Sequence, residues 1–146
     1  MLELAEFLAP LLKVGDSILL YGDIGCGKSV FARGVIHQRY RIEKAAIEDV
    51  PSPTFTIVQV YDSISPTITH VDLYRINSVE DVEILNLDRE IAMPKIIFIE
   101  WPENLQTDRN VDVIIDLEHD NQARHASIEC KDTNIESSIK TYYENE

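Results

Sequence analysis

The chain has 146 residues, the size of one domain, and 45% of them are hydrophobic, which is enough for a core and excludes wholesale disorder. Its net charge of −13 opposes stand-alone binding to DNA or RNA, because phosphate backbones repel an acidic chain. No apolar run approaches the about 18–20 residues of a membrane span, no signal peptide is evident, and two cysteines, Cys26 and Cys130, suit a reducing cytoplasm.

The first part of the chain predicts a helix, a strand and a second helix. Leucines at helical spacing predict a short helix over residues 2–12, and Pro10 should break it near its end. The apolar run 17–21 predicts a buried central strand of an α/β sheet. Residues 28–40 carry apolar side chains on one face, so they are expected to form a helix that packs back on that sheet.

The middle of the chain predicts an antiparallel hairpin and another buried strand. The runs 55–61 and 67–73 are rich in strand-forming residues and flank a polar link that ends in Pro66. Ser78, followed by acidic residues, has the pattern of a helix N-cap. Residues 95–100 (KIIFIE) form the second apolar run that is typical of a buried strand.

The last part predicts two more strands and a tail. Residues 111–117 are largely apolar with polar interruptions, and residues 123–130 are expected to return as another strand after a polar turn. Residues 1–130 are therefore one expected domain, and residues 131–146 are an acidic tail that is either a short helix or disordered. A strand, loop and helix followed by further strands indicate an α/β fold with a mixed sheet.

The stretch 22–29 (GDIGCGKS) matches the Walker A phosphate-binding pattern in full. Its glycines let backbone N–H groups curl around phosphate oxygens, and the following helix points its positive dipole end at them. Lys28 should reach the β- and γ-phosphates, and the Ser29 hydroxyl should ligand Mg²⁺. A chance glycine-rich turn is the alternative, but the motif has the required strand before it and helix after it. The expected nucleotide-binding residues are Asp23, Ile24, Gly25, Cys26, Gly27, Lys28, Ser29 and Val30.

Three residues outside the loop could complete such a site. Glu100 ends an apolar strand, where P-loop proteins place a carboxylate for Mg²⁺; the alternative is a surface glutamate. Asp72 could orient or deprotonate the attacking water or ligand the metal, or be a strand-end aspartate that pairs with Arg75. Thr54 lies in a proline-rich loop, where NTPases often place a switch that senses the γ-phosphate. His70, two residues before Asp72 and on the same strand face, is expected to be a core or hydrogen-bonding histidine.

The base is expected to be adenine. No Asn-Lys-x-Asp follows a strand to select guanine, and no Asp-x-x-Gly follows the hairpin. The expected cofactors are therefore ATP and Mg²⁺, and the expected fold is a P-loop NTPase-like three-layer α/β fold with a mixed, mostly parallel central sheet and antiparallel hairpins.

Four short motifs occur in a characteristic order: GDIGCGKS, SPTF (52–55), HVDLYR (70–75) and EWP (100–102). Together they closely resemble the TsaE family, also called YjeE, over about residues 2–130. This family consists of small bacterial ATPases of the pathway that makes threonylcarbamoyladenosine in tRNA. The resemblance implies two protein partners, TsaB and TsaD, of which TsaD carries out the transfer to tRNA. ATP hydrolysis by TsaE is thought to reset the complex between turnovers.

The resemblance also implies roles for single residues. Asp72 matches the family's catalytic aspartate, and Glu100 matches the glutamate that holds Mg²⁺. Trp101 matches a tryptophan that matters for activity and responds to nucleotide, and its role depends on the resemblance. The implied catalytic set is Lys28, Thr54, Asp72, Glu100 and Trp101, and the implied metal set is Ser29, Thr54 and Glu100.

The chain departs from the family pattern in places, and two other functions stay open. The loop has Gly-Cys-Gly-Lys-Ser where Gly-Ala-Gly-Lys-Thr is commoner, and Arg124 could meet nucleotide or a partner or be a surface arginine. A small-molecule kinase would need an arginine-bearing lid, but the candidate lid, residues 76–93, is mainly acidic, with Arg89 as its one arginine. A nucleotide-gated binding module with little hydrolysis is the third alternative.

Overall fold

The computed structural model describes residues 1–105 and 111–145; residue 146, the end of the expected tail, lies outside the described residues. The strands are β1 (Ser17–Tyr21), β2 (Val58–Tyr61), β3 (Ile68–Asp72), β4 (Ile96–Glu100), β5 (Val113–His119) and β6 (Arg124–Cys130). The helices are α1 (Leu2–Leu8), α2 (Lys28–Ile42), α3 (Val79–Ile84), α4 (Leu87–Ala92), the 3₁₀ turn η1 (Pro102–Leu105) and α5 (Thr133–Glu144).

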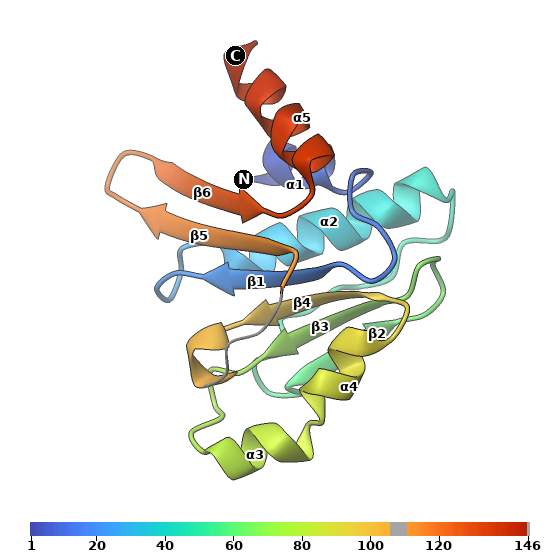
Figure 1. Cartoon of the computed structure of the whole chain (residues 1–146), viewed down its shortest axis with the longest axis vertical. Coiled ribbons are helices and arrows are strands. Elements are labelled where there is room, and N and C mark those ends of the chain that lie inside the picture. The colour runs from blue at the N-terminus through green and yellow to red at the C-terminus, as the bar shows by residue number, and fades with distance from the viewer. Residues whose placement is uncertain (106–110, 146) are drawn as a thin grey trace.

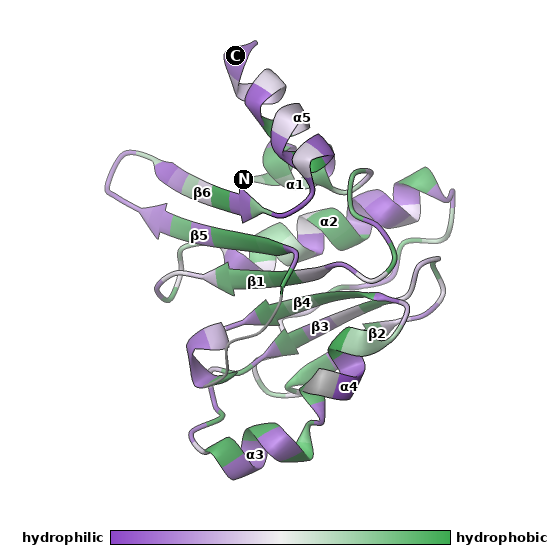
Figure 2. Ribbon diagram, in the orientation of Figure 1, coloured by the Kyte–Doolittle hydropathy of each residue, from purple (hydrophilic) through white to green (hydrophobic). Residues whose placement is uncertain are grey.

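The strands form one six-stranded sheet in the order β2-β3-β4-β1-β5-β6 (Figure 1). Strands β3, β4, β1 and β5 run parallel, whereas the edge strands β2 and β6 pair antiparallel with β3 and β5. The central strands β1, β3 and β4 are almost wholly buried, and β1 and β4 are hydrophobic along most of their length (Figure 2). The predicted α/β fold with a mostly parallel sheet and antiparallel hairpins is confirmed.

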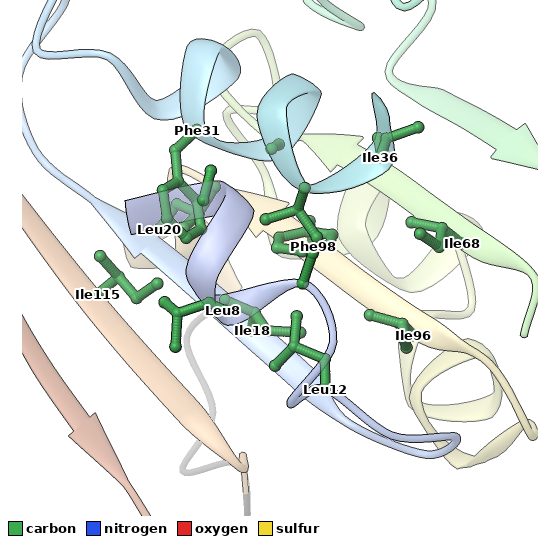
Figure 3. Close-up of a cluster of buried hydrophobic side chains, with 14 of the residues drawn as sticks. Leu8, Leu12, Ile18, Leu20, Phe31, Ile36, Ile68, Ile96, Phe98 and Ile115 are labelled. Carbon is green, nitrogen blue, oxygen red and sulfur yellow. The ribbon is translucent and has the colours of Figure 1, made fainter. Parts of the chain in front are cut away.

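Helices α1 and α2 cover one face of the sheet and enclose the larger core. Figure 3 shows Leu8 of α1 and Phe31 of α2 packed against side chains of the central strands, which are Ile18 and Leu20 of β1 and Phe98 of β4. The rings of Phe31 and Phe98 meet edge to face with centroids 6.5 Å apart. Burying a side chain of this size stabilises the fold by about 1.5–3 kcal/mol. This packing fixes the start of α2 beside the carboxyl end of β1.

The opposite face of the sheet is covered by α3, α4 and η1, which makes the third layer. Val82 of α3, Leu87 of α4 and Leu105 of η1 are buried against the side chains of the central strands. Ser78 caps α3 as predicted, because its hydroxyl accepts a 3.1 Å hydrogen bond from the backbone N–H of Asp81. The carboxyl ends of β1, β3 and β4 are left between the two helical layers.

Two predicted elements are shorter than expected by more than two residues. The first helix ends at Leu8 instead of reaching residue 12, because Pro10 lacks a backbone N–H and its ring clashes with a continuing helix. Strand β2 begins at Val58 instead of residue 55. The preceding residues 53–56 form turns, and Ile57 has a left-handed backbone with φ of 68°. These turns leave Phe55 82% exposed and direct the Thr54 side chain towards β3.

The described part of the C-terminal tail is a helix. The side chain of Asp132 caps α5 by accepting a 2.8 Å hydrogen bond from the N–H of Asn134. Ile135 is buried against the larger core, and the ring of Tyr142 stacks on Phe7 of α1 at 4.3 Å. In the chain that the structure describes, no helix is long and apolar enough to cross a membrane.

Candidate functional site

The Walker A stretch forms a loop between β1 and α2, and its glycines are required by its shape. Gly22 has φ of 130°, and a Cβ there would lie 2.3 Å from the carbonyl oxygen of Leu117. Gly27 is the N-cap of α2 with φ of 114°, and no side chain caps the helix. The first N–H groups of α2 are therefore left for an anion, which the positive end of the helix dipole also favours.

Lys28 is folded back into this loop and is only 5% exposed. Its ammonium donates hydrogen bonds to the carbonyl oxygens of Gly22 and, at 3.0 Å, of Asp23. It also lies 3.9 Å from the centroid of the Trp101 ring, close enough for a cation–π interaction. A buried ammonium needs such partners, because desolvation of an unpaired charge is costly.

A chain of hydrogen bonds connects the other predicted site residues. The Ser29 hydroxyl donates to Oε1 of Glu100 at 2.8 Å. Ser52 Oγ lies 3.3 Å from Ser29 Oγ and 2.9 Å from Thr54 Oγ1. The Thr54 hydroxyl in turn donates to Oδ2 of Asp72 at 2.8 Å. The loop at residues 52–54 thus connects the start of α2 to the end of β3.

Asp72 and Glu100 end neighbouring parallel strands and are paired in register. Each is 2% exposed. Oδ1 of Asp72 accepts a 2.9 Å hydrogen bond from the N–H of Tyr74. The alternative partner Arg75 instead places its guanidinium 5.1 Å from the centroid of the Phe55 ring. The two carboxylates therefore lie side by side in fixed positions at the carboxyl edge of the sheet. Open α/β sheets bind ligands at this edge.

The loop and the two carboxylates line a cavity of about 310 Å³. Every residue of the predicted catalytic and metal sets lines it, and so do all predicted nucleotide-binding residues except Asp23 and Cys26. Those two line a neighbouring cavity of about 680 Å³ that also carries Glu103 and Asp116. Tyr21 also lines this second cavity, where burial and the negative charges of Glu103 and Asp116 raise the pKa of its hydroxyl.

Sequence reasoning missed two contributors, Ser52 and Tyr74, and did not identify the partner of His70 or settle the role of Arg124. Ser52 belongs to the SPTF motif but was assigned no role, and Tyr74 lines the cavity with its ring 5.0 Å from that of Trp101. His70 is buried and hydrogen-bonded as expected, but its partner is Glu100, at 2.7 Å. Arg124 lines the cavity near the loop. Only the proximity of two hydroxyls in SPTF, and of His70 to Asp72, could have signalled these roles.

The backbone at Trp101 is strained. Its φ of 57° is rare for a bulky residue, and such conformations cost about 1–3 kcal/mol unless the surroundings fix them. Here the ring is held between Lys28 and Tyr74. The turn directs the Trp101 side chain into the cavity immediately after Glu100.

The donor set suits Mg²⁺ bound together with phosphates. Within residues 1–105 and 111–145, no group of three His, Cys, Asp or Glu side chains is placed to hold a metal alone. Mg²⁺ seldom uses such all-protein cages: it keeps several waters and takes one or two protein oxygens plus phosphate oxygens. The Ser29 hydroxyl and the Glu100 carboxylate, 2.8 Å apart at the cavity wall, provide such oxygens.

A glycine-rich loop between a buried strand and a helix, with carboxylates at the ends of the parallel strands β3 and β4, defines a P-loop α/β protein. The family model described as threonylcarbamoyl adenosine biosynthesis protein TsaE matches residues 1–128. The chain therefore belongs to the TsaE family.

Individual relatives agree with this assignment. A tRNA threonylcarbamoyladenosine biosynthesis protein TsaE of Rickettsia conorii is 37% identical over 142 residues, which cover 94% of this chain and 78% of the relative. The one from Rickettsia felis is 40% identical over 101 residues, 69% of this chain and 56% of the relative. The crystal structure of YdiB from Bacillus subtilis has the same fold, with a TM-score of 0.71 at 20% identity over 99% of this chain and 87% of YdiB.

Proposed function

We propose that this chain binds and hydrolyses ATP in the threonylcarbamoyladenosine modification of tRNA, acting with homologues of TsaB and TsaD. Membership of the TsaE family supports the pathway. The observation that carries the ATPase part is the hydrogen-bonded chain from Glu100 through Ser29, Ser52 and Thr54 to Asp72, placed along the cavity beside the phosphate loop.

The loop and Lys28 would bind the phosphates. The uncapped N–H groups of α2 and the backbone of the loop offer donors to phosphate oxygens. Lys28 would exchange the carbonyl oxygens of Gly22 and Asp23 for the β- and γ-phosphates, which are stronger, charged acceptors. That exchange would also move its ammonium relative to the Trp101 ring.

Ser29 and Glu100 would hold Mg²⁺, with Thr54 close by. Bound Mg²⁺ neutralises charge on the phosphates during phosphoryl transfer. The Ser29 oxygen keeps lone pairs while its proton is donated to Glu100, so the present hydrogen bond is compatible with a ligand role.

Asp72 would orient and deprotonate the attacking water. A general base must be fixed within hydrogen-bond reach of the reacting proton, and Asp72 is fixed by hydrogen bonds at both oxygens, from Thr54 and from the N–H of Tyr74. It lines the same cavity as Lys28 and Ser29. We expect weak hydrolysis by the chain alone, because a cation supplied by a partner accelerates many P-loop NTPases by about 10³–10⁵-fold.

The kinase alternative receives less support. Helices α3 and α4 make up most of the candidate lid, and they are packed onto the sheet through buried Val82 and Leu87. Arg89 is exposed and does not line the cavity. A lid that closes over phosphates would need this arginine to reach them.

ATP hydrolysis by the purified chain, alone and with the TsaB–TsaD complex, tests the proposal. Glu100→Ala is the inactive variant, and Glu129→Ala, which removes an exposed carboxylate on β6, is the matched control. Stimulation by the complex that Glu100→Ala abolishes and Glu129→Ala retains supports the proposal. Binding of ATP and complex without stimulation would favour the nucleotide-gated module, and failure to bind ATP would overturn the proposed function.

A further inference from the structure

We infer that His70 is a positioning residue for Glu100: its imidazole holds the carboxylate in the orientation that serves Mg²⁺ and Ser29. The inference rests on the proposed function, because it assumes that Glu100 and Ser29 hold Mg²⁺ with ATP. His70 would touch neither nucleotide nor metal and would act through Glu100.

The geometry of the pair of His70 and Glu100 is fixed by two adjacent strands. His70 lies on β3 and Glu100 ends the adjacent parallel strand β4. Nε2 of His70 is 2.7 Å from Oε1 of Glu100, and their side chains are only 1% and 3% exposed. Water is thus excluded from this contact. A hydrogen bond that is shielded from water is stronger than an exposed one, and removing one partner leaves a buried polar group unsatisfied, which costs free energy.

The hydrogen-bond pattern identifies the donor. Oε1 of Glu100 also accepts the Ser29 hydroxyl at 2.8 Å, and a carboxylate can only accept, so Nε2 of His70 carries the proton. Nδ1 of His70 is buried with no hydrogen-bond partner among the described residues. Nε2 is therefore the ring nitrogen through which His70 holds Glu100.

The consequence concerns the second carboxylate oxygen. Both hydrogen bonds to the Glu100 carboxylate from the described residues end on Oε1, which leaves Oε2 for water or metal at the cavity wall. Without His70, the carboxylate would retain only the Ser29 hydroxyl and could rotate. Loss of such an outer partner of a metal ligand commonly weakens metal affinity by about 10–100-fold.

The test is Mg²⁺-dependent ATP binding by the full chain, measured by calorimetry. His70→Leu removes the donor, His70→Gln places an amide N–H near the position of Nε2, and Thr69→Val is the matched control, a buried neighbour on β3 whose hydroxyl has no partner among the described residues. We expect His70→Leu to raise the Mg²⁺ concentration for half-maximal binding by about 10–100-fold and to leave Mg²⁺-free ATP binding unchanged. We expect His70→Gln and Thr69→Val to behave like wild type.

Two further measurements distinguish loss of the His70 contact from loss of the fold and from failure of the proposed function. If thermal melting shows that His70→Leu is unfolded, His70→Asn, whose shorter amide cannot reach Glu100, must show the same loss. In the nucleotide-free protein, ¹⁵N spectra of the ring must show a proton on Nε2 of His70, and a ring without it overturns the inference. Absent ATP binding by wild type would defeat the proposed function. A folded His70→Leu with the wild-type Mg²⁺ requirement would overturn only the role of His70.

Discussion

Thr54 and Asp72, 18 residues apart in the chain, are joined by a 2.8 Å hydrogen bond from the threonine hydroxyl to Oδ2 of the aspartate. This contact holds the loop at residues 52–54 against the end of β3. It makes the orientation of the proposed catalytic carboxylate depend on a side chain from a different segment.

Thr54→Val removes this hydroxyl while keeping the branched shape of the side chain. A hydrogen bond to a charged group contributes about 1.5–3 kcal/mol, so we expect ATP hydrolysis stimulated by the TsaB–TsaD complex to fall about 10–100-fold. Thr54→Ser keeps the hydroxyl and should retain most of the activity. Equal rates for Thr54→Val and wild type would show that the hydrogen bond does not orient Asp72.

Asp72→Asn tests the general-base role. Loss of a positioned base costs about 10²–10⁴-fold in rate, so hydrolysis should fall by that amount while ATP affinity, measured by calorimetry, stays close to wild type. Lost ATP binding would instead make Asp72 a metal ligand or a structural residue.

Lys28→Ala should weaken ATP binding about 10–100-fold, because it removes a charged donor to the phosphates. In wild type, ATP should also change the fluorescence of Trp101, since the ammonium lies 3.9 Å from the ring centroid before binding. Lys140→Ala, which removes an exposed lysine on α5, is the control and should leave both signals unchanged. If Lys28→Ala binds ATP with the affinity of the wild type, Lys28 does not bind the phosphates.

Gly34→Ala should destabilise the fold by about 1–3 kcal/mol, measured by denaturant unfolding. A Cβ at Gly34 would lie 2.8 Å from Cβ of Ala5, at the contact between α1 and α2. The additional substitution Ala5→Gly removes that atom, so a double-mutant cycle should show favourable coupling between the two changes. Additive effects of the two substitutions on the free energy of unfolding would mean that the contact between the two Cβ atoms does not cause the destabilisation.

Asp120 makes stability depend on pH in the acid range. Backbone N–H groups of Gln122 and Ala123 donate to its carboxylate and lower its pKa from 3.8 to about 2. Because the folded pKa is depressed, this contribution is present above pH 3.8 and is lost as the pH falls towards about 2. The melting temperature of Asp120→Ala should therefore fall less steeply over this range than that of wild type. Asp62→Ala, another exposed aspartate, should follow the wild-type slope.

Local patterns in the sequence were sufficient for the main elements of the fold. The buried strands β1 and β4 are continuous apolar runs, and the stop of α1 is predicted near Pro10 even though the expected helix extended too far. The antiparallel pairing of β2 with β3 follows from two strand-like runs joined by a short polar link. Residues 53–56 were wrongly assigned partly to a strand, because their turns depend on Thr54 reaching Asp72.

The sequence by itself determined the phosphate loop, because the glycines, Lys28 and Ser29 act through neighbouring backbone and one helix start, which are local properties. The tertiary structure alone decided the partners of these groups: Ser29 with Glu100, Lys28 with Trp101, and His70 with Glu100. Those contacts depend on the register of β3 against β4 and on the turn after Glu100. Segments far apart in the chain come together there because burying the apolar faces of the sheet fixes the order of its strands.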